Sequence, residues 1–580
     1  MDLDVVSRDL FLISMKHSKK YIRIPVILAL VMPILLTVPN IGLDITEHMT
    51  WIANTVNIIL PLSVYAFLFS LWRRVGLTTL LTLPIMCLAS FQIVLLFLYG
   101  GSIIGVDMFL NVATTSVSEA SELLGSLLTA IGFILILYVP PLVYAFLAVS
   151  RRMNLTQKFI RKYRKVAAVG LSLSVFMTIC CSIYVKDYTV KNYLFPINIF
   201  KNLELAFERV DNLKNYEANS RNFAYNAIST RPDTLPEVYV MVVGETSRGN
   251  NWQLAGYDRP TNPRLSETKG VVFYPKTITQ SNTTHKSVPM IISDLDATCF
   301  NDIDTHKSVL TAFKEAGYKT YFLSNQKRNR SYTEFFSNEA DSIYYMPDFT
   351  NELTYDHDLV KMMNDIVVND TINKKKFFVL HTYGSHFNYL DRYPENYAYF
   401  TPDRFDNANL KSRENLINAF DNTIRYVDSC LADAINALDS LDCSAALVYA
   451  ADHGEDIYDD KRKRFLHASP IPTSYQLHVP MIVWTSEELD EINPDFRKGL
   501  EGNTSKTVSS TVALFHTICT LAGLDMPSLK ENESLTSIDI VPFKFKYVSD
   551  RNECYSYKDM HFPKVDKKYL SEFDIEENKI

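Results

Sequence analysis

The sequence lacks an excess of basic residues. Its 58 Lys and Arg residues stand against 65 Asp and Glu residues, which gives a formal net charge of −7 at pH 7. Nucleic-acid-binding domains usually carry a basic patch or stripe, so this balance argues against nucleic acid as a partner. Internal repeats and low-complexity tracts are also missing from the 580 residues. A chain of this length and composition is expected to fold as more than one domain.

Cysteine is scarce, with eight residues in the whole chain. Three of them lie in apolar stretches of the N-terminal part, and the others are Cys299, Cys430, Cys443, Cys519 and Cys554. An odd number without regular spacing predicts no disulfide framework. A bridge between Cys430 and Cys443 stays open, although Cys430 falls in a segment that is expected to be helical.

Charge is sparse in the part of the chain before Val185, which contains five long apolar stretches. Each reaches the roughly 20 apolar residues that a membrane-spanning helix needs. The stretches are Ile24–Leu43, Trp51–Leu71, Leu77–Leu98, Leu127–Val149 and Val166–Val185. A cleaved signal peptide explains the first stretch poorly, because that stretch is too long and four more follow it. Internal prolines do not argue against the spans, since membrane helices tolerate proline better than soluble helices do.

Basic residues gather on one side of these predicted spans. The segment before the first span and the loops after the second and fourth spans carry Lys and Arg. The charged residues of the other two loops are all Asp or Glu. The positive-inside rule therefore predicts a cytoplasmic N-terminus and an extracytoplasmic domain after the last span. We predict a membrane domain of five helices, a polar connector with bridging helices and an outer domain, at residues 1–185, 186–236 and 237–580.

Strand-like and helix-like runs alternate from Glu237 onward. The predicted strands are Val238–Val243, Lys319–Leu323, Phe377–His381, Ala445–Ala450 and Val479–Trp484. The predicted helices are Ser308–Ala316, Arg413–Leu441 and Val508–Ala522. Continuous apolar strands separated by helices favour an α/β domain with a mostly parallel sheet that is covered on both faces. Ligands gather at the carboxyl ends of the strands in such sheets.

Acidic and imidazole side chains follow two of the predicted strands. Glu245 comes after VYVMVVG, and Asp452 with His453 comes after ALVYAA. Adjacent Asp and His residues on a tight loop that contains glycine can both face one metal ion. The plainer alternatives are a solvated loop acid at Glu245 and a turn-capping Asp452 beside an uninvolved His453.

A hydroxyl group and two further imidazoles complete the candidate site. Thr284 lies in SNTTHKSVPM, where the preceding polar residues could cap a helix and Pro289 suits its first turn. A helix N-terminus attracts phosphate, and a metal-bound Thr284 would be a nucleophile for phosphorus or sulfur esters. His386 and His467 could bind a second metal ion or donate protons, although a lone histidine is more often structural.

These motifs, in this order and after five predicted spans, resemble the phosphoethanolamine transferases of Gram-negative envelopes, which belong to the alkaline phosphatase and sulfatase superfamily. The segments that carry the resemblance are GETSRGNNWQLAGYDRPTNPRL, SNTTHKSVPM, GSHFNYLDRYP, FDNTIRYVD, AADHGED and LHASP. The resemblance implies transfer of phosphoethanolamine from phosphatidylethanolamine to an envelope glycolipid through a phospho-threonine intermediate. It also implies the superfamily's α/β fold, an inner-membrane location and a periplasmic catalytic domain. We expect a monomer.

The resemblance also implies roles for individual residues. The residues that match the family's zinc ligands, with Thr284 as the nucleophile, are Glu245, Thr284, Asp452 and His453. The residues that match its additional substrate or second-zinc histidines are His386 and His467. The residues that match its ethanolamine-binding positions are Asn111, Thr115 and Glu119. One zinc ion is expected, and a second could be held.

The sequence departs from the family in one respect. Many members place cysteines in the nucleophile motif, where this chain has Gln280 or Ser281 and Met290. The departure leaves the acceptor open among lipid A, the lipopolysaccharide core, a periplasmic glucan and another surface glycan. The competing functions are a lipoteichoic-acid-type glycerophosphate transferase and a catalytically inactive membrane receptor. A sulfatase is disfavoured because its C/S-x-P-x-R motif is missing at Thr284.

Overall fold

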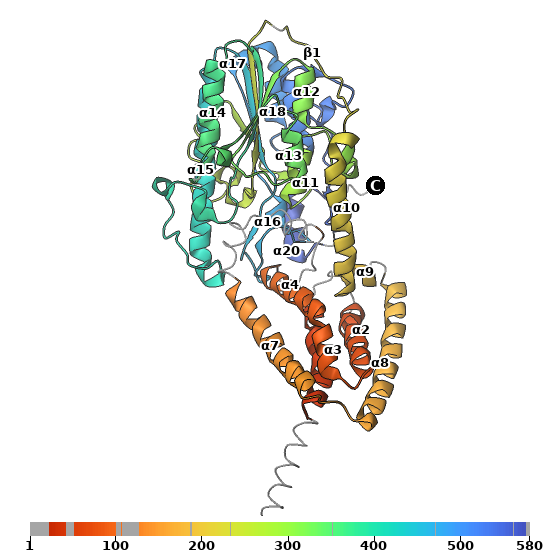
Figure 1. Cartoon of the computed structure of the whole chain (residues 1–580). Helices are drawn as coiled ribbons and strands as arrows, with labels where there is room; N and C mark the ends of the chain where they lie inside the picture. Colours follow the sequence, from red (N-terminus) through yellow and green to blue (C-terminus); the bar gives the residue numbers. More distant parts are fainter. Residues whose placement is uncertain are drawn as a thin grey trace, which may run out of the picture. The chain divides into compact units, whose positions relative to one another are not determined.

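Two compact units make up the chain. The structure, a computed structural model, describes residues 23–41, 51–99, 106, 127–185, 188–232, 234–350, 352–469, 471–560 and 562–575. Contacts between Cα atoms group residues 1–104 with 123–204, and residues 105–122 with 205–580. We call the first group the helical unit and the second the α/β unit (Figure 1). The domain limits predicted at residues 185 and 236 stay a prediction.

The helical unit consists mainly of apolar helices. Residues 23–37 are helical and lead into the 3-10 turn η1 (Val38–Asn40). The helices that follow are α2 (Trp51–Ser70), α3 (Val75–Leu81), α4 (Leu83–Tyr99), α7 (Leu128–Ser150), α8 (Gln157–Tyr184) and α9 (Val190–Tyr193). Among the described residues, four helices are long and apolar enough to cross a membrane, or five if α3 and α4 count as one broken span.

The third predicted span, Leu77–Leu98, is bent rather than continuous. Helix α3 and the start of α4 meet at an angle of 53°. Pro84 explains the break, because it has no N–H for the carbonyl of Leu80 and its ring crowds that carbonyl. At the end of α3, the hydroxyl of Thr82 donates to the carbonyl of Thr79 over 2.7 Å. This proline is therefore accommodated by a helix break and not inside one helix.

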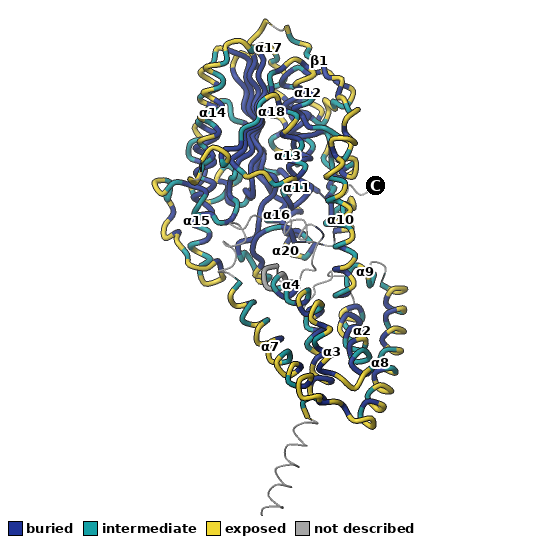
Figure 2. Tube along the Cα trace, in the orientation of Figure 1, coloured by how far each residue is buried: buried dark blue, intermediate teal, exposed yellow. Residues whose placement is uncertain are grey.

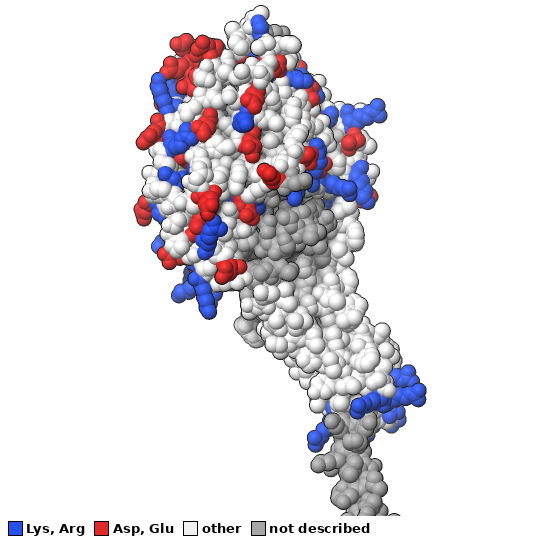
Figure 3. Space-filling model, turned by 60° about the vertical axis from the view of Figure 1, so that its left-hand side comes forward, with Lys and Arg blue, Asp and Glu red and all other residues white. Residues whose placement is uncertain are grey.

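Polar side chains join the helices of this unit. Tyr163 in α8 donates to the carbonyl of Ala29 over 2.7 Å, and Arg164 donates to the carbonyl of Ser70 at the end of α2. On the face shown in Figure 3, charged side chains of both signs are scattered over the α/β unit, whereas the apolar helices show Lys and Arg only near one end. An apolar band with basic residues at one end is the pattern expected of membrane-spanning helices.

A seven-stranded sheet organises the α/β unit, with the strand order β3–β11–β8–β2–β7–β5–β6. The strands are β2 (Glu237–Gly244), β3 (Val271–Phe273), β5 (Lys319–Ser324), β6 (Ser342–Tyr345), β7 (Lys375–His381), β8 (Ser444–Ala451) and β11 (Met481–Thr485). Strands β8, β2, β7, β5 and β6 pair in parallel, whereas β11 is antiparallel to both β8 and β3. The prediction of a mostly parallel sheet is confirmed.

Helices cover both faces of this sheet (Figure 1). The helices from residue 197 onward are α10 (Ile197–Asn219), which contains the boundary between the units, α11 (Thr284–Ile291), α12 (Val309–Glu315), α13 (Tyr332–Ser337), α14 (Asp356–Asn369), α15 (Arg413–Asp439), α16 (Ser474–Leu477), α17 (Glu487–Ile492), α18 (Pro494–Gly502), α19 (Ser510–Leu521) and α20 (Lys564–Leu570). Met241 of β2 belongs to the same core cluster as Leu310 of α12 and Leu514 of α19. Its neighbour Val242 lines a pocket with Leu359 of α14. Successive β2 side chains point to opposite faces, and β2 is buried along its whole length (Figure 2).

Short strands complete the α/β unit. They pair as β1 (Ile228–Ser229) with β13 (Leu524–Asp525), β4 (Thr277–Ile278) with β12 (Val508–Ser509), β9 (Asp456–Ile457) with β10 (Phe465–Leu466), and β14 (Lys546–Val548) with β15 (Cys554–Ser556).

The disulfide bridge left open between Cys430 and Cys443 is not formed, since both thiols are free and buried.

Three predicted element limits need correction. The last predicted strand starts at Met481 and not at Val479, because Pro480 has no N–H and the N–H of Val479 donates to Thr277. The helix predicted from Val508 starts two residues later, since Val508 and its neighbour form β12. Pro289 lies in the second turn of α11 and not the first, because the helix already begins at Thr284.

Candidate metal centre and nucleophile

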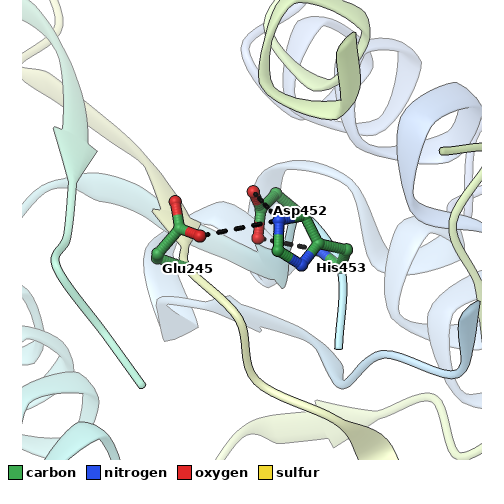
Figure 4. Close-up of side chains that lie close together, drawn as sticks. All are labelled: Glu245, Asp452 and His453. Atoms are coloured by element: carbon green, nitrogen blue, oxygen red, sulfur yellow. Dashed lines mark hydrogen bonds and ion pairs between the residues drawn. The ribbon is translucent and has the colours of Figure 1, made fainter. Parts of the chain in front are cut away.

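The candidate site lies at the carboxyl ends of neighbouring parallel strands. Glu245 directly follows β2, Asp452 and His453 directly follow β8, and His386 follows β7 after a short loop. Because β8, β2 and β7 are adjacent and parallel, their ends meet at one edge of the sheet. Residues that lie some 200 positions apart in the sequence are therefore neighbours in space (Figure 4).

Glu245, Asp452 and His453 form a buried group whose potential ligand atoms all lie within 4.8 Å of one another. Nε2 of His453 is 3.6 Å from Oε1 of Glu245 and 3.3 Å from Oδ2 of Asp452 (Figure 4). Two carboxylates and an imidazole are ligands that zinc commonly takes in proteins. The structure thus brings together three of the four predicted metal ligands as one possible metal site.

The hydrogen bonds of His453 determine which ring nitrogen carries the proton. Nδ1 lies 3.0 Å from the carbonyl oxygen of Gly454, which can only accept, so Nδ1 is the donor. Nε2 therefore presents its lone pair to the carboxylates of Glu245 and Asp452. Burial, and next the nearby His467, lower the pKa of the His453 imidazole, so the ring is neutral at neutral pH. A lone pair that faces two carboxylates fits a cation between them.

Asp452 shows the same need for a cation. Its Oδ1 accepts backbone hydrogen bonds from Thr246 over 3.0 Å and His453 over 2.7 Å. Its Oδ2 is buried and accepts no hydrogen bond from the described residues. Burial, and next the carboxylate of Glu245, raise the pKa of Asp452 well above its usual value. Leaving a buried acceptor without a partner costs about 1–3 kcal/mol, and a bound metal ion would remove this cost. The residues present therefore fit a metal ion.

Thr284 brings the predicted nucleophile to this group. It is the first residue of α11, and its Oγ1 donates to Oε1 of Glu245 over 3.2 Å. The same oxygen lies 3.1 Å from Nε2 of His453. Thr283 occupies the N-cap position, but its side chain makes no capping hydrogen bond. The hydroxyl of Thr284 therefore faces the carboxylates and the imidazole and does not serve as a helix cap.

Neutral groups that the sequence analysis did not single out hold Glu245 in place. Thr246 Oγ1 donates to Oε1 of Glu245 over 2.6 Å, and Gln326 Nε2 donates to Oε2 over 3.1 Å. Gln326 lies just past β5, so its position at a strand end was a signal that could have identified it. Gly384 has a φ of +52°, and an added Cβ there would lie 2.5 Å from the carbonyl oxygen of Glu245. The loop after β7 therefore passes directly over this metal-ligand candidate.

The two predicted histidines lie beside the group. The ring of His467 stacks on His453 with centroids 4.0 Å apart, and the ring of His386 lies 6.4 Å from that of His467. Nδ1 of His386 lies 2.6 Å from the carbonyl of Phe387, and Nδ1 of His467 lies 3.2 Å from the carbonyl of Asn282. Both rings therefore carry a proton on Nδ1, and the neutral form of each ring has its lone pair on Nε2. Burial within the site, and next His386, lower the pKa of His467 to about 3, so its imidazole is neutral at neutral pH.

The three predicted residues for binding of the head group have no described position relative to this site. Asn111, Thr115 and Glu119 lie outside the residues that the structure describes. Their predicted role in binding the ethanolamine head group stays a prediction from the family resemblance.

Comparisons with known proteins give a consistent result. The sulfatase family model matches residues 237–524. Phosphoethanolamine transferase EptA of Salmonella typhimurium is 32% identical over 295 residues, which cover 49% of this chain and 53% of that protein. The match to this and similar curated relatives thus spans about half of their length.

Solved structures extend the similarity to both parts of the chain. The C-terminal periplasmic domain of EptC from Escherichia coli, in complex with zinc, is 26% identical and aligns with a TM-score of 0.50 over 57% of this chain and 96% of that domain. The integral membrane protein lipooligosaccharide phosphoethanolamine transferase A of Neisseria meningitidis aligns with a TM-score of 0.66 over 89% of this chain and 97% of that protein, at 21% identity, and shares the fold. With its apolar helices and sulfatase-type α/β unit, this chain belongs to the phosphoethanolamine transferase family of the sulfatase superfamily.

Proposed function

We propose that this protein transfers phosphoethanolamine from phosphatidylethanolamine to a hydroxyl or phosphate group of an envelope glycolipid. The observation that carries the proposal is the hydroxyl of Thr284, which lies 3.2 Å from Glu245 and 3.1 Å from His453 at a buried candidate metal site. The printed names of the Salmonella and Neisseria relatives give the transferred group, and the second name gives lipooligosaccharide as that protein's acceptor. These names support the same donor group and the same class of acceptor for this chain.

Glu245, Thr284, Asp452 and His453 would hold one zinc ion, in agreement with the zinc complex of the E. coli relative. Bound there, zinc supplies Lewis-acid chemistry, since it lowers the pKa of a coordinated hydroxyl group and polarises a phosphoryl oxygen. We assign His386 and His467 to the substrate and not to a second zinc ion. The ring of His467 stacks on His453 with centroids 4.0 Å apart, which places it beside the reacting group.

The reaction would proceed in two displacements at phosphorus. In the first, Oγ1 of Thr284 forms a bond to the donor phosphorus, and the bond between phosphorus and the diacylglycerol oxygen breaks. The proton that Thr284 loses passes through Nε2 of His386 or His467 to that diacylglycerol oxygen. In the second, an acceptor oxygen displaces Thr284 from phosphorus, and the acceptor's proton returns to the threonine oxygen. Each histidine has the lone pair on Nε2 that this proton transfer needs.

The distribution of charges in the sequence supports an N-terminus in the cytoplasm, spans in the inner membrane and the α/β unit in the periplasm. The basic loops of the helical unit support this orientation. A donor lipid would then reach the site by diffusion within the membrane. Asn111, Thr115 and Glu119 would bind its head group, with the carboxylate of Glu119 facing the ammonium group.

A covalent adduct tests the proposed function directly. The purified full-length protein would be loaded with zinc and mixed with phosphatidylethanolamine in detergent, without an acceptor. Mass spectrometry of the peptide that contains Thr284 should then show an added phosphoethanolamine group. A Glu119→Gln variant should form this adduct more slowly while it keeps its zinc. An added glycerophosphate group from phosphatidylglycerol would support the glycerophosphate transferase instead, and no adduct from either lipid would count against both transferases.

We expect a His467→Asn variant to transfer slowly and still bind zinc. Loss of a general acid–base group typically costs 10²- to 10⁴-fold in rate, whereas the metal-ligand candidates Glu245, Asp452 and His453 are unchanged. Transfer rate and zinc content measured on one preparation check this. His306→Asn is the matched control, because Nδ1 of His306 contacts a carbonyl on an exposed 3-10 segment. Equal rates for the two variants would remove His467 from the mechanism.

A further inference from the structure

The C-terminal strand β14 holds the segment that leads to the nucleophile. The hydroxyl of Tyr547 donates to Oδ1 of Asn282 over 2.7 Å. The N–H of the next residue, Val548, donates to the carbonyl of Gln280 over 2.8 Å. Tyr547 and Asn282 are 2% and 3% exposed, so their hydrogen bond is shielded from water. Both contacts fall within four residues of Thr284.

The residue after β14, Ser549, binds the chain just after the nucleophile Thr284. Lys286, the third residue of α11, is 1% exposed, and its Nζ donates to the carbonyl of Ser549 over 2.6 Å. A buried ammonium group needs such acceptors, because its burial without them is costly. Three consecutive residues, Tyr547 to Ser549, therefore bind chain positions on both sides of Thr284.

Asn282, which Tyr547 holds, also forms hydrogen bonds to the loop that carries His467. Its carbonyl accepts the N–H of Ala468 over 3.2 Å and lies 3.2 Å from Nδ1 of His467. Its side-chain Nδ2 donates to the carbonyl of Ser469 over 2.8 Å and to Oε1 of Gln476 over 2.6 Å. Tyr547 thus donates to Oδ1 of an amide whose Nδ2 binds Ser469 in this loop and Gln476 in α16.

We propose that Tyr547 is a positioning residue for the transfer reaction, acting through Asn282 to hold the hydroxyl of Thr284 and Nε2 of His467 in a fixed relation. Its hydroxyl donates to Asn282, so its effect on the site is expected to pass through that amide. The sulfatase family model ends at residue 524, so this restraint comes from a part of the chain beyond that match. The inference rests on the proposed function, because its effect is read as a rate of phosphoethanolamine transfer.

The Tyr547→Phe variant removes only the phenolic oxygen and therefore tests the hydrogen bond to Asn282. In Tyr547→Phe, Oδ1 of Asn282 loses its buried donor, and the amide can turn to seek another one. Such a turn would break the bonds of Nδ2 to the His467 loop. A shift of about 1 Å between reacting groups can cost on the order of 100-fold in rate. Glu245, Asp452 and His453 keep all their own contacts, so zinc binding through these three residues is expected to stay unchanged.

The test compares two tyrosines that face each other across one strand pair. Tyr547 pairs with Tyr555 of β15, whose hydroxyl donates to exposed Glu553 over 2.7 Å. In the full-length protein, Tyr547→Phe should lower kcat at least about tenfold and leave the donor KM and the zinc content unchanged. Tyr555→Phe should leave all three unchanged. A kcat for Tyr547→Phe equal to that of the wild type, or a loss of zinc that parallels the loss of activity, would overturn the proposal.

A double-mutant cycle separates positioning from general loss of stability. If Tyr547 acts through Asn282, the Tyr547→Phe and Asn282→Ala double variant should be no slower than Asn282→Ala alone. Rates that multiply would show independent effects and would also overturn the proposal. Assays run well below each variant's melting temperature keep unfolding out of the measured rates. Failure of the proposed function would show differently, as absence of the Thr284 adduct in the wild-type protein.

Discussion

Transfer activity should vanish in a Thr284→Ala variant while the protein stays folded. Oγ1 of Thr284 is the atom that would form the bond to phosphorus, and alanine offers no replacement for it. We expect the rate to fall by on the order of 10⁴-fold or more, as is typical when a covalent nucleophile is removed. Stability should change by only about 1 kcal/mol, because the lost group is one half-buried hydroxyl at a helix start. Transfer kinetics and thermal melting on the same preparation check both statements.

The neighbouring threonine provides the matched control. The hydroxyl of Thr283 lies 3.3 Å from that of Ser281, whereas it is the hydroxyl of Thr284 that contacts Glu245 and His453. Thr283→Ala should therefore transfer at close to the wild-type rate, and Thr284→Ser should keep part of the activity because it retains a hydroxyl. Full transfer by Thr284→Ala would rule out covalent catalysis at this residue.

Asp452→Asn should bind zinc at least about 100-fold more weakly than the wild type. Loss of a residue that only supports a metal ligand typically costs 10- to 100-fold in affinity, and loss of the ligand itself should cost more. The amide also removes a negative charge that lies beside Glu245 in a buried site. Competition with a chromophoric chelator measures the affinity. Zinc should raise the melting temperature of the wild type but not that of the variant, because only a bound ligand stabilises the fold.

A second buried aspartate serves as the control for this variant. Asp428 accepts backbone hydrogen bonds from Arg264 and Leu265 over 3.0 and 2.9 Å, away from the candidate metal group. Asp428→Asn should keep the zinc affinity of the wild type even if it is less stable. Undiminished zinc in Asp452→Asn would remove Asp452 from the set of ligands.

The fold and the metal-ligand group were predictable because their signals are local in the sequence. An apolar run predicts a strand, and Glu245, or Asp452 with His453, follows such a run directly. The same pattern therefore predicts that these side chains lie at the end of the strand. The parallel arrangement then brings these ends together without further information. The break before Pro84 was less predictable, because a proline can be accommodated inside a membrane helix or can interrupt it.

The residues that hold the site in place could not be predicted from the sequence in the same way. Gln326 and Asn282 are neutral amides, and such residues in loops usually cap turns or face solvent. Their roles depend on partners far away in the sequence, since Tyr547 is 265 positions from Asn282 and Gln326 is 81 positions from Glu245. Pairings of this kind follow from the closed tertiary structure and leave no periodic pattern in the chain.

Gly384 carries a consequence for the evolution of this site. Its backbone lies so close to Glu245 that a methyl group would meet the carbonyl oxygen at 2.5 Å, and its φ of +52° already disfavours other residues. Any side chain there would push apart the loops that bear Glu245 and His386. Working relatives should therefore hold glycine at this position. A homologue with another residue at this position would be a candidate for a protein that has kept the fold and lost the chemistry.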